Sequence, residues 1–252
     1  MPPVTVGVSL KMYFGHRVAR AWLADAADIA ASTRAVADGD VEFFVAPTYP
    51  QLIPALEAFG GTRARVAAQD AAEHDAGAYT GEVSPAELAE VGVELVELGH
   101  AERRRLYGET DAVVARKTAA ALRNGLTPVL CVGEHDQVAA GDALAFSTAQ
   151  VLSALRGASP GRVIVAYEPV WAIGAPEPAP VDHIRAVTSG LRRLLADLDD
   201  RPGSAVIYGG SAGPGLLTRL GDDVDGLFLG RFAHNPTALR EVLAEAAALA
   251  RR

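Results

Sequence analysis

The sequence predicts a single-domain α/β protein, in which eight parallel strands alternate with eight helices and close into a (β/α)8 barrel. Three observations support this prediction. Short apolar runs recur along the 252 residues, Ala- and Leu-rich stretches of helical period separate them, and no linker or low-complexity segment interrupts the alternation. Eight strand–helix units in roughly 250 residues are typical of the commonest closed α/β barrel, so the expected domain spans residues 1–252.

The expected strands are short runs rich in Val, Ile and Phe, and several are almost continuously apolar, as parallel strands covered on both faces are. In chain order they are Val4–Ser9, Val41–Ala46, Arg65–Ala68, Val93–Leu98, Leu126–Val132, Val163–Tyr167, Ala205–Tyr208 and Gly226–Leu229. An open, doubly wound sheet is the alternative. It usually has fewer strands and a G-x-G-x-x-G turn after the first strand, and this sequence has no such turn.

The expected helices fill the intervals between the strands and are rich in Ala, Leu, Arg and Glu. They are Val18–Val36, Gln51–Phe59, Pro85–Val91, Ala112–Asn124, Gln137–Leu155, Asp182–Leu198, Gly215–Leu220 and Thr237–Ala250. Ser84 and Asn235 are typical helix caps, each followed by proline in the first turn, and Gly125 is a typical helix stop.

Composition and charge make some classes of function less favoured than others. Half of the residues are hydrophobic and the formal charge is −8. This charge argues against non-specific nucleic-acid binding but not against an anionic ligand, since local backbone N–H groups can bind one. Cys131 is the lone cysteine, so no intramolecular disulfide is possible, and we expect it to be a small buried residue. With neither a secretory leader pattern nor a run of about 20 apolar residues, a cytoplasmic protein without a membrane partner is expected.

Chemistry in such barrels gathers at the carboxyl ends of the strands. The residues that follow the expected strands include Ser9, Lys11, Gln69, His100, Glu102, Cys131, Glu134, Glu168, Gly209-Gly210-Ser211 and Gly230-Arg231. One histidine among several carboxylates offers too few converging ligands for a metal, and no strand lysine is placed to form a Schiff base. Aldolase and metal-dependent hydrolase classes are therefore disfavoured, and neither a metal nor a cofactor is expected. The remaining histidines lie outside any motif and are expected at the surface or in loops: His16, His74, His135, His183 and His234.

Five motifs along the chain resemble, in order, those of the triosephosphate isomerase family. They are Gly77–Glu82 (GAYTGE), Val96–Arg104 (VELGHAERR), Cys131–Glu134 (CVGE), Ala166–Gly174 (AYEPVWAIG) and Tyr208–Ser211 (YGGS). The resemblance implies the TIM-barrel fold. It also implies a cofactor-free isomerase that moves a proton on a short phosphorylated ketose through an enediol or enediolate.

By this resemblance, Glu168 is the base that removes the proton, and Lys11 places its ammonium by the developing oxyanion and the phosphate. His100 is a neutral hydrogen-bond donor to the substrate oxygens, as is known for that family. It precedes a helical run whose amino end disfavours a charged imidazole. Glu102 resembles the family's buried glutamate that pairs with the lysine.

The resemblance also implies how the substrate and a second subunit are held. Backbone N–H groups of Gly174, Ser211, Gly230 and Arg231 would bind the phosphate, because glycine-bearing turns allow close approach to an anion. Pro169-Val170-Trp171 resembles the hinge of a lid. Thr80 resembles the residue that reaches into a neighbouring subunit's site, which implies a homodimer.

Several positions near the expected site depart from the family pattern. Ser9 stands where asparagine is usual, Ala101 where serine is usual and Arg231 where a second glycine is usual, and the lid tip at residues 175–178 carries two prolines. Ser9 leaves room near the carbon chain, and Arg231 can reach a phosphate or a hydroxyl of a longer substrate. This combination is similar to the branch of the family that isomerises erythrulose phosphates.

The sequence therefore favours a tetrulose phosphate, interconverted between L-erythrulose 1-phosphate and D-erythrulose 4-phosphate. The first alternative is a true triosephosphate isomerase, which acts on dihydroxyacetone phosphate and glyceraldehyde 3-phosphate in glycolysis. The second is a barrel that binds phosphate without catalysis. Intact Lys11, His100 and Glu168 count against that second alternative.

Overall fold

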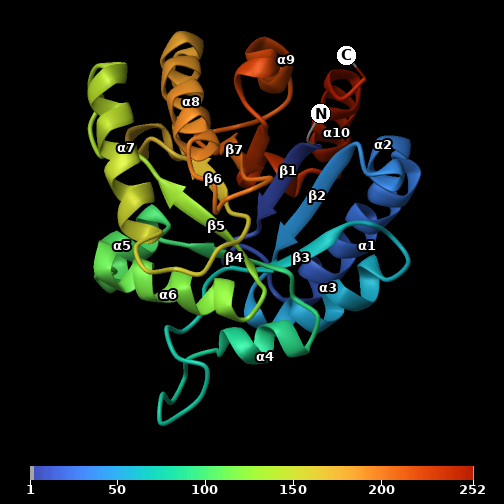
Figure 1. The fold of residues 1–252 in the computed structure, drawn as a ribbon. Helices are drawn as coiled ribbons and strands as arrows, with labels where there is room; N and C mark the ends of the chain where they lie inside the picture. Colours follow the sequence, from blue (N-terminus) through green and yellow to red (C-terminus); the bar gives the residue numbers. More distant parts are fainter. Residues whose placement is uncertain (1–2, 252) are drawn as a thin grey trace.

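The computed structural model describes residues 3–251, so the ends of the expected domain, residues 1–2 and 252, lie outside the described residues. Eight parallel strands pair in sequence order, and the last pairs with the first to close a barrel (Figure 1). They are β1 Val4–Ser9, β2 Val41–Ala46, β3 Arg65–Ala68, β4 Leu95–Leu98, β5 Thr127–Val132, β6 Ile164–Tyr167, β7 Ala205–Tyr208 and β8 Gly226–Leu229. The predicted (β/α)8 barrel, a single domain, is confirmed.

Helices follow the strands and form the outer layer of the barrel (Figure 1). They are α1 His16–Ser32, α2 Arg34–Asp38, α3 Leu52–Phe59, α4 Pro85–Glu90, α5 Ala101–Tyr107, α6 Asp111–Arg123, α7 Ala140–Ala154, α8 Val181–Ala196, α9 Leu216–Leu220 and α10 Pro236–Leu249, with short 3-10 turns at Tyr49–Gln51, Val170–Ala172, Gly221–Asp223 and Arg231–His234. None of the helices within residues 3–251 combines the length and the apolarity that crossing a membrane requires.

Most helix limits fall within a few residues of the prediction, and both predicted caps are present. The Ser84 hydroxyl accepts from the N–H groups of Ala86 and Glu87, and the Asn235 side chain accepts from the N–H of Thr237. The single helix predicted over Val18–Val36 is wrong, because Thr33 adopts an extended backbone and ends α1. Its hydroxyl donates to the carbonyl of Ile29, so a side chain competes locally with helix continuation.

The inside of the barrel is a packed core of side chains that alternate along the strands. Phe44, Leu95, Ile164 and Phe228 belong to this inner cluster and are almost fully buried. Gly7 makes room for the Phe44 ring, because a Cβ atom on Gly7 would lie 2.2 Å from that ring's Cζ. A filled interior leaves the carboxyl end of the barrel as the place where a ligand can enter.

A partly buried ion cluster lies at the start of the strands, around the Glu42 carboxylate of β2. Glu42 accepts hydrogen bonds from the Thr5 hydroxyl at 3.0 Å and from the guanidinium groups of Arg65 and Arg162 at 2.5 to 2.7 Å. Burial opposes ionisation, but the bonds from Arg162 and the charge of Arg65 outweigh it and hold the pKa of Glu42 below its usual value.

We expect Glu42→Gln to lower the free energy of unfolding by about 2 kcal/mol at pH 7, because it leaves two partly buried guanidinium groups without their counter-ion. A depressed folded-state pKa contributes stability above pH 4.5, the ordinary value, which is lost as the pH falls towards the folded-state value. The difference in the free energy of unfolding between the native protein and Glu42→Gln should therefore become smaller at acid pH. Urea unfolding at several pH values measures it, with exposed Glu57→Gln as the control; equal stability of Glu42→Gln and the native protein contradicts this account.

Candidate active site

A cavity of about 1110 Å³ opens at the carboxyl end of the barrel. All of the predicted site residues contribute to its lining: Ser9, Lys11, His100, Glu102, Glu168, Gly174, Ser211, Gly230 and Arg231. They come from the ends of β1, β4, β6, β7 and β8 and from the loop after β6. Residues far apart in the sequence therefore share one cavity, because parallel strands in a closed barrel present their carboxyl ends to the same face.

Lys11 follows β1 and adopts a left-handed backbone with φ of 47°, which is uncommon for a residue with a side chain. The Gln69 amide donates to its carbonyl at 3.0 Å and thereby fixes this turn. The Lys11 ammonium donates to Glu102 Oε1 at 2.8 Å. Burial alone would lower the pKa of Lys11, but Glu168 and Glu102 raise it above its usual value, so the ammonium stays charged.

Glu102, in the first turn of α5, pairs with Lys11 as expected, but its side chain is 41 % exposed rather than buried. Burial is the largest single effect on its pKa and raises it, but the hydrogen bond and the charge of Lys11, with weaker neighbouring charges, together lower this pKa below the usual value. This carboxylate therefore holds the ammonium at the cavity edge and remains ionised.

His100 caps the amino end of α5. Its Nδ1 accepts from the N–H of Glu102 at 3.1 Å, so in a neutral ring the proton must reside on Nε2. Burial, and then the neighbouring Lys11 charge, lower the pKa of His100 to about 4. At neutral pH the ring is uncharged and presents an N–H donor to the cavity.

Two donors therefore face each other, because Lys11 Nζ and His100 Nε2 lie 3.1 Å apart. Neither can accept from the other while both carry protons, so a ligand oxygen that accepts from both would satisfy the pair. Such an arrangement is typical of sites that stabilise negative charge developing on oxygen.

Glu168 follows β6, and its carboxyl group is buried at the cavity wall. Its Oε2 lies 3.4 Å from His100 Nε2 and has no hydrogen-bond partner among the described residues. Burial raises the pKa of Glu168 to about 8, opposed by Lys11 and assisted by Glu97. Gly209 permits this approach, because a Cβ atom there would lie 2.4 Å from Glu168 Oε1. A dry carboxyl group with an unpaired oxygen is suited to accepting a proton from carbon.

Backbone N–H groups of the loops after β6, β7 and β8 also lie at the cavity. Within residues 3–251, the N–H groups of Gly174, Ser211 and Gly230 are paired with no other backbone group. Ser211 has a left-handed backbone with φ of 48°, and its hydroxyl lies within hydrogen-bond distance of the carbonyls of Ala172 and Ala175 in the loop after β6, so it donates to one of them. Unpaired N–H groups on adjacent loops form an anion-binding surface despite the net negative charge.

The Arg231 side chain lines the cavity and reaches the same loop. Its Nη2 donates to the Gly174 carbonyl at 3.1 Å, and a side chain on Gly174 would meet this guanidinium. The side chain is exposed, and its bond to Gly174 uses one of the five N–H donors of a guanidinium group. Arg231 therefore joins the loop after β8 to the loop after β6, a role that the sequence did not predict.

The loop after β6 is held at both of its ends. Trp171 Nε1 donates to Glu134 Oε1 at 2.8 Å near its start, and the N–H of Ala179 donates to the Tyr208 hydroxyl at 2.9 Å near its end. The span between these bonds contains the two prolines of the tip. These contacts are typical of a lid that closes on fixed hinges.

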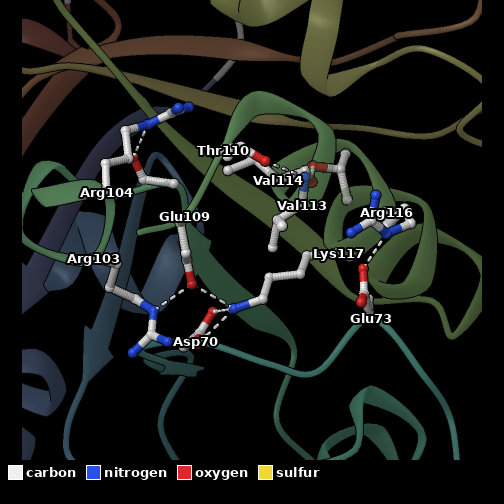
Figure 2. Close-up of polar contacts among 12 residues, drawn as sticks. Asp70, Glu73, Arg103, Arg104, Glu109, Thr110, Val113, Val114, Arg116 and Lys117 are labelled. Carbon is white, nitrogen blue, oxygen red and sulfur yellow. Dashed lines mark hydrogen bonds and ion pairs between the residues drawn. The ribbon is translucent and has the colours of Figure 1, made fainter. Parts of the chain in front are cut away.

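An ion network behind α5 fixes the helix that carries His100 and Glu102. Figure 2 shows Arg103 and Lys117 converging on Asp70 and Glu109. Lys117 Nζ lies 2.7 Å from Asp70 Oδ1 and 2.5 Å from Glu109 Oε1, and Arg103 contacts the same two carboxylates at 2.8 and 2.6 Å. The network ties α5 to α6 and to the end of β3.

Thr80 does not line the cavity of its own chain. It is exposed in the loop between β3 and α4, which projects from the barrel (Figure 1). Ion pairs from Glu73 to Arg116 and from Asp75 to Arg123 anchor the first part of this loop to α6 (the first is drawn in Figure 2).

Sequence reasoning missed two polar residues. Glu97 lies inside β4 and lines the cavity; its position two residues after the inward-facing Leu95 was the available signal. His183 was expected at the surface or in a loop, and this expectation is wrong. It lies in α8 with its Nε2 2.9 Å from the Tyr167 hydroxyl, on the face that Val187, four residues later, also presents to the core.

We expect Glu168 to titrate near pH 8, because burial disfavours its charged form. Lys11→Met should raise this pKa further by removing the nearby positive charge, whereas Arg63→Met, an exposed control, should leave it unchanged. Carboxyl ¹³C NMR of glutamate-labelled protein, assigned with Glu168→Gln, measures the values. Titration of Glu168 near 4.5 in the native chain contradicts this description of the site.

Comparison with known proteins agrees with this geometry. The family model for triosephosphate isomerase matches residues 4–246. An L-erythrulose-1-phosphate isomerase of Pectobacterium atrosepticum is 48% identical over 247 residues, covering 96% of this chain and 95% of the relative. One of the same name from Rhizobium etli is 40% identical over 86% of each chain, and a triosephosphate isomerase of Symbiobacterium thermophilum is 36% identical over 96% of each. The chain therefore belongs to the triosephosphate isomerase family of (β/α)8-barrel isomerases.

Proposed function

We propose that this cavity isomerises a short phosphorylated ketose by proton transfer through an enediolate, without a cofactor. The observation that carries the proposal is the pair of donors, Lys11 Nζ and His100 Nε2, beside the unpaired oxygen of Glu168. A ketose oxygen between the donors would place the adjacent carbon near the Glu168 carboxylate.

The groups then act in a fixed order. The Glu168 carboxylate removes the proton from the carbon next to the carbonyl, and the electron pair moves to the carbonyl oxygen. Lys11 and neutral His100 stabilise that oxygen by hydrogen bonds, and Glu102 keeps the lysine in place. A proton then passes from the hydroxyl group on the first carbon to the former carbonyl oxygen, a transfer that neutral His100 can relay through Nε2, and Glu168 gives its proton to the former carbonyl carbon. The atoms and electrons balance, so the product is an isomer and no oxidant is consumed.

The phosphate would bind the N–H groups of Gly174, Ser211 and Gly230, with Arg231 beside them. Because the Gly174 carbonyl and the Ser211 hydroxyl both belong to contacts between the lid and the barrel, phosphate binding and lid position are coupled. Closure would exclude water from the enediolate, which prevents loss of the phosphate as a side reaction.

We propose a tetrulose phosphate as the substrate, interconverted between L-erythrulose 1-phosphate and D-erythrulose 4-phosphate. Three relatives that are 40–48% identical are L-erythrulose-1-phosphate isomerases. Ser9 supports the same substrate, since its short side chain leaves space at the end of the carbon chain. The alternative is dihydroxyacetone phosphate and glyceraldehyde 3-phosphate in glycolysis, favoured by triosephosphate isomerase relatives at 36–41% identity.

We also propose that the protein is a cytoplasmic homodimer in which the Thr80 loop completes the neighbouring subunit's site. Large apolar side chains support an interface, because Met12, Tyr13 and Tyr79 are exposed in the loops after β1 and β3. Met12 directly follows Lys11, so a partner covering it would also restrain the lysine. A single buried cysteine is consistent with a reducing compartment.

We expect Glu168→Gln to lower kcat on L-erythrulose 1-phosphate by about 10³-fold or more, because the amide cannot accept the proton. Binding of a non-reacting phosphate ligand should change little, since the N–H groups are untouched. Exposed Glu90→Gln is the control and should retain full activity. A Glu168→Gln variant with native turnover would remove this residue from the reaction.

Turnover measured with both classes of sugar phosphate tests which of them is the substrate. Native enzyme should convert the tetrulose phosphates with a higher kcat/KM than dihydroxyacetone phosphate, and the product formed in D₂O should carry deuterium at the carbon that received the proton. A higher kcat/KM for dihydroxyacetone phosphate would establish the triosephosphate isomerase alternative. If neither the tetrulose phosphates nor dihydroxyacetone phosphate is converted, the protein only binds its ligand.

The homodimer predicts that Thr80→Arg dissociates the protein and lowers kcat/KM, because a charge at the loop tip would be buried without a partner. Sedimentation velocity should show a dimer for the native chain and a monomer for the variant. Arg20→Glu, at an exposed position on α1, is the charge-change control. A native chain that sediments as a monomer at the assay concentration contradicts the proposal.

A further inference from the structure

Glu97 is a buried carboxyl group in the cavity that the proton-transfer scheme does not use. It lies on β4, two residues after Leu95 and so on the inward face, and it is 3 % exposed. The cavity contacts it from above, together with Ser9, Lys11, His100 and Glu168. The position therefore lies at the floor of the site, one strand layer below His100.

Glu97 has one clear hydrogen-bond partner. The Ser9 hydroxyl donates to its Oε2 at 2.8 Å, and the Cys131 thiol, a weak donor, is 4.0 Å from its Oε1. Lys11 is near enough to act on its charge, yet within residues 3–251 no cation forms an ion pair with this carboxyl group. A carboxyl group can make more hydrogen bonds than one serine supplies, and because Glu97 lines the cavity it has capacity left for a ligand.

Stabilisation of the barrel does not explain this residue. Its inward-facing neighbours are apolar, among them Leu95, Val129 and Ala166, and an apolar side chain would fill the same space without a cost of desolvation. Burial raises the pKa of Glu97 to about 7, against the effects of Lys11 and Ser9. Both protonation states are therefore accessible near neutral pH, and either one can bond a hydroxyl group.

The proposed substrates supply such a hydroxyl. A tetrulose phosphate is a triose phosphate in which one hydrogen on the reacting carbon far from the phosphate is replaced by a hydroxymethyl group. The carbonyl moves between the two central carbons, so this hydroxymethyl group is unchanged in both isomers. A ligand whose phosphate binds at Gly174, Ser211 and Gly230 would meet Ser9 and Glu97, which line the same cavity, with the far end of its carbon chain.

We propose that Ser9 and Glu97 together form the subsite that binds the terminal hydroxyl group of a tetrulose phosphate. This inference rests on the proposed function and identifies what selects four carbons over three. Serine supplies the space, and the Glu97 carboxyl group supplies the partner for the hydroxyl. A triose phosphate would leave the subsite empty and the Glu97 carboxyl group with Ser9 as its main partner, so it would lack the contact that the longer substrate makes.

The test compares four-carbon and three-carbon ligands on native enzyme and variants. Glu97→Ile removes the carboxyl group, Glu97→Gln retains hydrogen bonding, and Ser9→Ala removes the hydroxyl that orients the carboxyl group. The control is Glu94→Gln, at an exposed position just before β4. Turnover is measured with L-erythrulose 1-phosphate. Calorimetry measures the Kd of two hydroxamate phosphates that mimic the four-carbon and three-carbon enediolates.

We expect Glu97→Ile to lower kcat/KM for L-erythrulose 1-phosphate about 100-fold, and to raise the Kd of the four-carbon hydroxamate by a similar factor. The three-carbon hydroxamate should change less than about threefold, since it makes no contact with the subsite. Glu97→Gln and Ser9→Ala should fall between the native enzyme and Glu97→Ile, and Glu94→Gln should match the native enzyme.

Equal weakening of both hydroxamates in the Glu97 variants would overturn the subsite and leave the proposed isomerase intact. Failure of the native enzyme to convert either tetrulose phosphate would instead overturn the proposed function. If thermal unfolding shows that Glu97→Ile does not fold, the test rests on Glu97→Gln and Ser9→Ala. The ratio of the four-carbon Kd to the three-carbon Kd is then compared with that of the native enzyme. A ratio that is unchanged in both variants contradicts the inference.

Discussion

Closure of the sheet between β1 and β8 is the constraint on which the site depends. Thr5 to Val8 pair in register with Gly226 to Leu229, and this pairing requires a close approach of the two backbones. Gly226 has a φ of 155°, and a Cβ atom there would lie 1.7 Å from the Thr5 carbonyl oxygen. Glycine at this position therefore lets the ring of strands close. Without closure, Lys11 at the end of β1 would not face the loops after β7 and β8.

Within the closed ring, burial and neighbouring charges together set the charge of each ionisable group. The pKa of Glu168 is raised and that of His100 is lowered, in both cases with burial as the largest cause. Lys11 remains charged because carboxylates surround it. The site thus combines a buried carboxyl group of raised basicity with a neutral donor and one fixed cation. This combination suits proton transfer beside a carbonyl better than hydrolysis or group transfer.

The fold was predictable because strand-forming runs and helical stretches alternate eight times with little ambiguity. Element limits differed where side chains act locally, as at Thr33. The motifs identified residues that the fold places around one cavity, but they did not predict the direction of each side chain. Glu97 lies in a strand that is otherwise apolar, so the sequence pattern did not mark it as a site residue. His183 lies in a helix, and tertiary packing determines which face of that helix is buried. The contact of Arg231 with the lid carbonyl joins two loops 57 residues apart, which no local pattern encodes.

The central claim is that Lys11, His100 and Glu168 surround one bound ketose phosphate. The most direct measurement is a crystal structure of the protein with a four-carbon hydroxamate phosphate that mimics the enediolate. The account predicts hydrogen bonds from Lys11 Nζ and His100 Nε2 to the mimic's oxygens, Glu168 over its central atoms, and the phosphate on the N–H groups of Gly174, Ser211 and Gly230. A mimic bound elsewhere, or one whose oxygens contact neither donor, would contradict it.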